Sequence, residues 1–190
     1  MDPTAENGMT TDVILSLGSN QGDRAAWLAF GVRVLAAHPC IRLTDTSPVY
    51  KTEPVEVPNA YAKAWYFNQI VICETDLDVQ TFSAFMHRIE QDAGRQRGDT
   101  LNLPRTLDID LIAFGGVCME TPDLTVPHPR AKQRRFVLQP LADLRPDYRF
   151  PGDGECVCEI LAKLPAHPEA FLVDAHLERT KESAKWNYPF

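Results

Sequence analysis

Residues 105–115 read RTLDIDLIAFG, a strand-like stretch that contains two aspartates. Its apolar residues are dense enough for a buried strand, in which successive side chains point to opposite faces of the sheet. One face of such a strand carries three apolar side chains: Leu107, Ile109 and Leu111. The other face carries Asp108 and Asp110, two like charges whose repulsion destabilises a sheet. The pair therefore requires partners that compensate the repulsion.

Three further strands are expected before this one. Residues 13–17, 41–50 and 65–74 have the apolar density of strands, and Pro48 should break the second or displace it to a sheet edge. A loop rich in proline follows the second strand, from residue 52 to residue 60. Its prolines deny it regular structure.

Two helices are expected between these strands. Asp23 should cap the first, which His38-Pro39 stops, and Asp78 should cap the second, which ends at Gly94. The resulting order is strand-helix-strand-strand-helix-strand. This order predicts an α+β fold, the ferredoxin-like β-α-β-β-α-β sandwich, in which both helices cover one face of an antiparallel sheet.

The rest of the chain adds to this sandwich. The patterns of residues 132–144 and 156–164 predict two more helices, which would be C-terminal additions to the sandwich. We expect a disordered N-terminus over residues 1–12, a single domain over 13–165, and a polar tail over 166–190 that lies over the surface.

The composition is that of an acidic globular protein. The 190 residues carry a net charge of −7, which argues against a general affinity for nucleic acid or for an anionic membrane. The polar, acidic N-terminus is not a signal peptide, and no apolar run is long enough for a membrane helix. Five scattered cysteines, with Cys156-Val157-Cys158 lacking a second pair for a zinc site, indicate reduced thiols. We therefore expect a cytoplasmic protein.

The two aspartates should face away from the helices. They are either solvated strand residues or ligands of Mg²⁺, which takes carboxylate oxygens and would remove their repulsion. Two ions beside such a pair suit phosphoryl transfer, with one near the attacking oxygen and the other near the leaving oxygen.

Basic residues lie on both sides of the aspartates in the sequence. Arginine forks match phosphate oxygens, so two clusters around an Asp-x-Asp strand indicate phosphoryl transfer. The first cluster is Arg95, Arg97 and Arg105, and the second, within PHPRAKQRRF, is His128, Arg130, Lys132, Arg134 and Arg135.

Fewer residues are candidates for binding the acceptor of the phosphoryl group. Asn68 lies among apolar residues in the middle of a strand, where its amide must find partners. Tyr66 and Phe136 would sandwich a flat heterocycle while Asn68 binds its edge. The alternative is that these are ordinary core residues.

Taken in order, several motifs resemble the 6-hydroxymethyl-7,8-dihydropterin pyrophosphokinase family of folate biosynthesis. They are LGSN, SPVYKTEPV, YFNQIV, RIEQDAGRQR, PRTLDIDLIAFG and VPHPRAKQRRFVLQPL, spread from about residue 13 to residue 150. The resemblance implies transfer of the β,γ-pyrophosphoryl group of ATP to the pterin hydroxymethyl oxygen, with release of AMP.

The resemblance also implies roles for individual residues. Two Mg²⁺ ions would be held by Asp108 and Asp110. Contacts to ATP would come from Glu90, Arg95, Arg97, Arg105, His128 and Arg134. Contacts to the pterin would come from Thr52, Val55, Tyr66, Asn68 and Phe136. Arg95 and Arg105 are the expected transition-state stabilisers, and no residue is required as a general base. The substrates are small molecules, and we expect a monomer or weak homodimer.

The chain departs from the family pattern in three places. Leu101-Asn102-Leu103 replaces the residues expected before Pro104-Arg105, in a segment that forms a lid in the family. An aromatic residue that many members carry at position 102 is replaced by asparagine. His87 and Pro129 stand where some members have Gln and Tyr near the nucleotide.

Two other functions fit parts of the pattern. A polymerase-palm-like nucleotidyl transferase also uses paired aspartates, but it releases pyrophosphate rather than AMP. An RNA-binding RRM or a small-molecule sensor has the same order of elements, but the strand aspartates would repel an RNA backbone. Loss of both aspartates would leave such a binding module functional.

Overall fold

The computed structural model describes residues 10–54, 64–94, 105–168 and 170–173. In chain order the elements are β1 (Thr11–Ser19), α1 (Arg24–Ala37), β2 (Ile41–Thr46), β3 (Tyr50–Thr52), β4 (Tyr66–Thr75), α2 (Val79–Asp92), β5 (Asp108–Phe114), β6 (Met119–Glu120), β7 (Thr125–Val126), a 3₁₀ turn (Ala131–Gln133), α3 (Arg135–Leu144), α4 (Val157–Lys163) and β8 (Ala170–Leu172). Among the described residues, no helix has the length and apolar character needed to cross a membrane.

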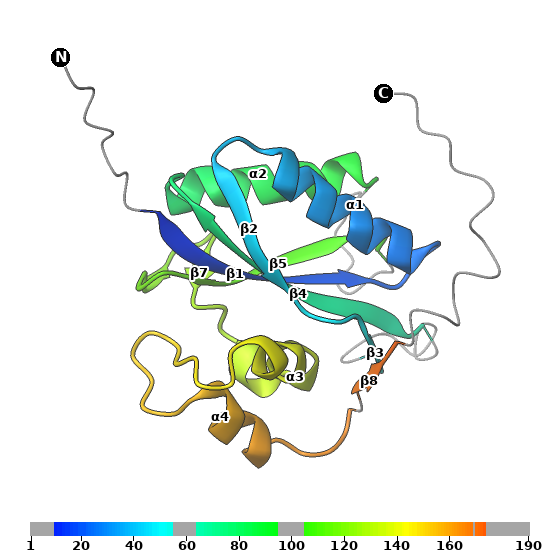
Figure 1. Ribbon diagram of the computed structural model, residues 1–190, viewed down its shortest axis with the longest axis vertical. Coiled ribbons are helices and arrows are strands. Elements are labelled where there is room, and N and C mark those ends of the chain that lie inside the picture. Colours follow the sequence, from blue (N-terminus) through cyan, green and yellow to red (C-terminus); the bar gives the residue numbers. More distant parts are fainter. Residues whose placement is uncertain (1–9, 55–63, 95–104, 169, 174–190) are drawn as a thin grey trace.

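The main sheet is antiparallel and has helices on both faces. Its strand order is β5-β1-β4, both β2 and β3 pair with the other edge of β4, and β8 pairs with β3. Helices α1 and α2 lie on one face, and α3 and α4 lie on the opposite face (Figure 1). This arrangement confirms the predicted ferredoxin-like α+β sandwich with C-terminal helical additions.

The helices α1 and α2 begin where capping residues satisfy their first backbone N–H groups. The Asp23 carboxylate accepts a hydrogen bond from the Ala26 N–H (3.0 Å), and that of Asp78 accepts from the Thr81 N–H (2.9 Å). Gly94, just after α2, has a φ of +84°, the left-handed conformation that ends many helices. Three predicted boundaries are thereby confirmed.

One sheet face packs against α1 and α2 to form the larger core. The predicted apolar face of β5 contributes three buried side chains to this core: Leu107, just before the strand, Ile109 and Leu111. They are at most 5% exposed and share the cluster with Leu28 of α1 and Phe82 of α2.

The opposite face changes from apolar to polar along the adjacent strands β5, β1 and β4. The apolar part, under α3 and α4, includes Ile14 of β1, Ile70 of β4 and Ile112 of β5. Further along the same face, β1 carries Ser16 and Gly18, β4 carries Asn68 and Tyr66, and β5 carries Asp110 and Asp108. The strand register places Gly18 between Asn68 on one side and Asp108 on the other. This polar half of the face forms the floor of the candidate site.

Two predicted boundaries require correction. The disordered N-terminus expected over residues 1–12 does not reach residue 12, because β1 begins at Thr11. The helix expected from residue 132 begins at Arg135 instead, because Arg134 has extended backbone (φ −109°, ψ 106°) that separates the 3₁₀ turn from α3. Part of the tail expected to lie over the surface forms a strand that was not predicted, the exposed edge strand β8, whose residues Ala170–Leu172 pair with β3. This pairing depends on an edge strand about 120 residues earlier, which no local pattern reveals.

Candidate active site

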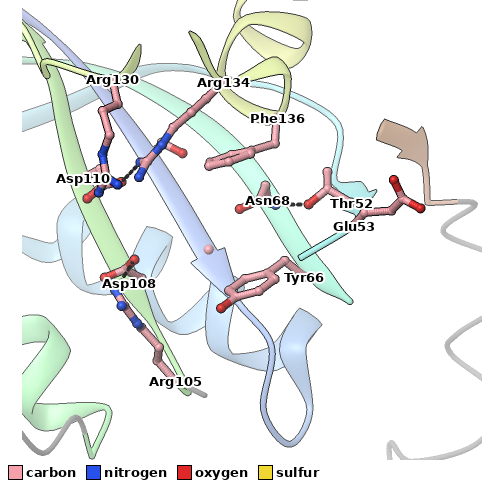
Figure 2. A pocket seen from close by; sticks show the side chains of 12 residues that line it. Thr52, Glu53, Tyr66, Asn68, Arg105, Asp108, Asp110, Arg130, Arg134 and Phe136 are labelled. Carbon is pink, nitrogen blue, oxygen red and sulfur yellow. Dashed lines mark hydrogen bonds and ion pairs between the residues drawn. The ribbon is translucent and has the colours of Figure 1, made fainter. Parts of the chain in front are cut away.

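Each of the two strand aspartates is paired with an arginine. The Arg105 Nη1 atom lies 2.6 Å from Asp108 Oδ2, and the Arg134 Nη1 atom lies 3.1 Å from Asp110 Oδ2 (Figure 2). The aspartate side chains are 22% and 31% exposed, so both carboxylates remain accessible from the pocket. Two arginines from different segments thus compensate the repulsion between Asp108 and Asp110.

Arg105 is held in place by the turn that follows β1. The Asn20 side-chain Oδ1 accepts a hydrogen bond from the Arg105 N–H (2.7 Å), and the Asn20 N–H donates to the Arg105 carbonyl (3.2 Å). Burial opposes the charge of Arg105, but the Asp108 carboxylate outweighs it and raises the pKa of the guanidinium. Asn20 lies within the quoted LGSN motif, but its role was not predicted.

Glu90 supports the aspartate strand from its other side. This α2 residue is only 2% exposed, and its Oε1 accepts a hydrogen bond from the backbone N–H of Ile109 (2.9 Å). Ile109 lies between the two aspartates, so Glu90 fixes the backbone that carries them. Its expected contact with ATP stays a prediction.

His128 lies beside Asp110 and is neutral at neutral pH. Its Nε2 is 3.9 Å from Asp110 Oδ2, and its Nδ1 accepts a hydrogen bond from the Arg130 N–H (3.1 Å). Burial, together with the charges of Arg134 and Arg130, lowers the pKa of His128 to about 4. Because Nδ1 is an acceptor, the single proton is on Nε2, which faces Asp110.

Asn68 occupies the far end of the same pocket. It is 4% exposed, and its Nδ2 donates a hydrogen bond to the Thr52 hydroxyl (2.6 Å), which leaves the amide oxygen for another partner. Phe136 of α3 and Tyr66 of β4 lie on either side of Asn68 (Figure 2). Burial raises the pKa of Tyr66, so its phenol stays protonated. The three side chains form a slot for a flat ring that has hydrogen-bonding edges.

Gly18 forms the floor between this slot and Asp108. A Cβ at this position would lie 2.9 Å from Asn68 Oδ1, closer than real Cβ contacts. A larger residue here would therefore force the Asn68 amide to shift within the slot.

The pocket brings together eight of the predicted site residues: Thr52, Tyr66, Asn68, Arg105, Asp108, Asp110, Arg134 and Phe136. It also contains Arg130 of the second basic cluster, together with Ser16, Gly18 and Glu53, which were not predicted as site residues. Two basic residues of the second cluster point elsewhere: Lys132 pairs with Asp153, and Arg135 donates to the Leu164 and Pro165 carbonyls. The predicted residues Val55, Arg95 and Arg97 lie outside the described residues.

A second hollow adjoins the first at Asp110. It lies beside α2 and the β6–β7 hairpin, and His128 lines it together with His87 and Pro129. Asp110 therefore lines both spaces, the one with the aromatic slot and the one beside α2.

Known proteins resemble this chain over most of its length. Residues 14–146 match the family of 7,8-dihydro-6-hydroxymethylpterin-pyrophosphokinase (HPPK). The chain belongs to the HPPK family. The 2-amino-4-hydroxy-6-hydroxymethyldihydropteridine pyrophosphokinase of Methylorubrum extorquens is 39% identical over 154 residues, which are 81% of this chain and 94% of that protein. The enzyme of the same name from Bacillus subtilis is 36% identical over 136 residues, covering 72% of this chain and 79% of the relative.

Solved HPPK structures share the fold. HPPK-DHPS of Plasmodium falciparum with pteroate matches with a TM-score of 0.63 at 14% identity, over 84% of this chain and 41% of that one. An HPPK-DHPS structure in complex with substrates has the same TM-score at 13% identity, over 81% of this chain and 44% of that one. The chain thus spans less than half of these longer proteins.

The donor set suits the magnesium ions expected for an HPPK. Asp108 and Asp110 offer oxygen ligands on one strand face, and both are open to the pocket. Mg²⁺ is bound by one or two carboxylates together with waters and substrate phosphates. In the described structure each of these carboxylates is paired with an arginine, Asp108 with Arg105 and Asp110 with Arg134.

Proposed function

We propose that this chain transfers the β,γ-diphosphoryl group of ATP to the hydroxymethyl oxygen of 6-hydroxymethyl-7,8-dihydropterin, with AMP as the second product, in folate biosynthesis. One observation carries most of the proposal: a single pocket combines two aspartate–arginine pairs with an amide between two aromatic rings. The first part suits a polyphosphate with Mg²⁺, and the second suits a pterin.

The slot at Asn68 would bind the acceptor. Tyr66 and Phe136 offer flat apolar surfaces to the two faces of the pterin ring, and Asn68 and Thr52 offer hydrogen bonds to its edge. Val55 is proposed as a further contact. The order of residues along the pocket would then point the hydroxymethyl group towards Asp108, past the open floor at Gly18.

The aspartate end would bind the triphosphate. Asp108 and Asp110 would hold two Mg²⁺ ions, which when bound neutralise negative charge on the phosphates and on the transferred group. Arg105 and Arg134 would bind phosphate oxygens, with Arg95, Arg97, Glu90 and His128 as further ATP contacts. A neutral His128 can donate one hydrogen bond from Nε2 without adding a charge.

The reaction needs little from the protein beyond positioning and charge stabilisation. The hydroxymethyl oxygen attacks the β-phosphorus, the bond from that phosphorus to the bridging oxygen of the α-phosphate breaks, and the hydroxyl proton passes to solvent. Negative charge grows on the bridging oxygen and on the transferred group, where arginine guanidinium groups stabilise it. Arg95 and Arg105 are proposed for this role.

The test is a product assay with ATP, Mg²⁺ and 6-hydroxymethyl-7,8-dihydropterin that separates AMP, ADP and pyrophosphate. We expect AMP to form one-for-one with the pterin diphosphate. Asp110→Ala should lower kcat by at least about a thousandfold, as loss of a metal ligand and a charged group at the reacting centre does. Asp45→Asn, an exposed β2 position away from the pocket, should leave it unchanged.

Each other outcome has a distinct meaning. Release of pyrophosphate would favour the nucleotidyl transferase. Substrate binding that survives loss of both Asp108 and Asp110, with no AMP formed by the wild-type protein, would favour a binding module.

A further inference from the structure

A second cluster of potential metal ligands lies outside the active site, where α4 begins. Asp147 comes from the segment after α3, Cys156 is the N-cap residue of α4, and Cys158 lies in the first turn of that helix. One ligand atom from each of the three lies within 4.8 Å of the others. The sequence offers one closely spaced cysteine pair and no second pair to complete a metal site. The fold brings the carboxylate of Asp147 next to these two thiols.

Backbone hydrogen bonds hold the two segments together. The Val157 N–H donates to the Tyr148 carbonyl (2.8 Å), and the Cys158 N–H donates to the Pro146 carbonyl (3.0 Å). These bonds flank Asp147 on both sides, so its side chain is held next to the thiols. Val157 is fully buried in the core against α3, which anchors the arrangement.

The two sulfur atoms already point to the same place. Cys156 Sγ and Cys158 Sγ are 2.7 Å apart. Two thiolates bound to one tetrahedral Zn²⁺ are roughly 3.7 Å apart, given Zn–S bonds of about 2.3 Å. Cys156 is 5% exposed whereas Cys158 is exposed, so the Cys158 side chain has room on the solvent side to rotate toward that separation.

The chemistry of the three ligands selects the kind of ion. Thiolates favour soft or borderline ions such as Zn²⁺, whereas Mg²⁺ prefers oxygen ligands alone. Nearby basic side chains are paired elsewhere: Arg149 pairs with Glu159 at 3.6 Å, and Lys163 pairs with Glu155. The exposed positions of Asp147 and Cys158 give an ion access from solvent.

We propose that Asp147, Cys156 and Cys158 bind Zn²⁺ or a chemically similar ion, at a site separate from the Mg²⁺ ligands of the active site. With three protein ligands, a four-coordinate ion has one position for water. The ion would tie the segment after α3 to the start of α4 and so stabilise the layer that carries Arg134 and Phe136.

Cadmium titration of the fully reduced full-length protein tests the proposal. Cd²⁺ binds the same ligands as Zn²⁺ and gives an ultraviolet charge-transfer band when it binds thiolates. We expect a band that saturates at one Cd²⁺ per chain and disappears when excess Zn²⁺, but not Mg²⁺, is added. Zn²⁺ should also raise the Tm of the wild-type protein.

Three variants identify the ligands. Cys158→Ser should abolish the band and the rise in Tm, and Asp147→Asn should weaken Cd²⁺ binding by at least about tenfold. Cys118→Ser, which removes another exposed thiol, should change neither. Circular dichroism confirms that each variant is folded. The proposal is overturned if the band persists in Cys158→Ser, if Cys118→Ser loses it equally, or if the reduced wild-type protein gives no band at equimolar Cd²⁺.

Discussion

At the scale of single residues, the site is built by side chains that each fix a neighbour. Asn20 holds the backbone of Arg105, Arg105 pairs with Asp108, and Glu90 holds the Ile109 N–H between the two aspartates. Because positioning carries much of the rate in phosphoryl transfer, residues that never touch the substrates are expected to change the rate.

Gly18→Ala is expected to narrow the acceptor slot. The new methyl group would lie 2.9 Å from Asn68 Oδ1, and overpacking of this kind costs about 1–3 kcal/mol. The KM for the pterin should therefore rise by about tenfold or more, while the KM for ATP changes little. Gly116→Ala is the matched control, since a Cβ there meets nothing within 4 Å. An unchanged pterin KM in Gly18→Ala would show that the acceptor binds away from this floor.

Asn20→Ala is expected to lower kcat more than it raises either KM. The substitution removes the acceptor of the Arg105 N–H, a net loss of about 1 kcal/mol that lets Arg105 move away from Asp108. Asn20→Asp keeps an oxygen at the same position and should retain most of the activity. Steady-state kinetics measure both variants, and equal kcat values for Asn20→Ala and the wild type would contradict the role of Asn20.

The sequence alone identified the site residues whose polar side chains stand among apolar neighbours in a strand. Asp108, Asp110 and Asn68 are polar side chains inside apolar strands, which is visible without a structure. Gly18 and Asn20 could not be identified in this way, because their roles depend on Asn68 and Arg105, about 50 and 85 residues away. Their own neighbours in the sequence look like an ordinary turn.

At the scale of elements, the sequence predicted strands and helices wherever a local signal exists. The caps at Asp23 and Asp78, the break at Pro48 and the Gly94 stop all follow from the chemistry of one or two residues. The start of α3 and the existence of β8 do not follow from such local chemistry. Both depend on distant partners: Arg134 reaches Asp110, and β8 pairs with β3.

Strand β8 is expected to stabilise the part of the site that binds the acceptor, around Thr52 and Asn68. It pairs with Tyr50–Thr52, Phe171 packs near Trp65 with ring centroids 6.1 Å apart, and Thr52 binds Asn68. A chain truncated after residue 168 should therefore show faster hydrogen exchange at residues 49–52 and a pterin KM raised severalfold. Truncation after residue 173, which keeps β8, is the matched control. If both truncations behave alike, β8 does not support the slot.

At the scale of the whole molecule, the site lies between two layers. The sheet supplies the aspartates and Asn68, and the layer of α3 and α4 supplies Arg134 and Phe136 (Figures 1 and 2). The order of elements predicted the sheet and the position of α1 and α2. It could not predict how α3 docks, because that depends on apolar packing across the second face, among Ile70, Ile112, Val137 and Leu138.

Because the site joins two layers, nucleotide binding is expected to stabilise the whole fold through Arg134. Mg²⁺ and ATP at about a hundred times Kd add about 2.7 kcal/mol, which raises the Tm of a protein of this size by roughly 5–10 °C. Arg134→Gln should weaken ATP binding by at least about tenfold and reduce this rise in Tm. Arg135→Gln changes the neighbouring arginine, which bonds to the Leu164 and Pro165 carbonyls instead.

Thermal unfolding with and without Mg²⁺ and ATP therefore separates the two arginines. Arg135→Gln is expected to lower the Tm without ligand, since it loses bonds that hold the end of α4, but to keep the full rise on adding ATP. Arg134→Gln should instead lose about half of the rise or more, because a tenfold loss of affinity at this ligand concentration removes about 1.3 kcal/mol. Equal ligand-induced rises in both variants would mean that the triphosphate contacts the sheet alone, and that α3 contributes only Phe136 to the site.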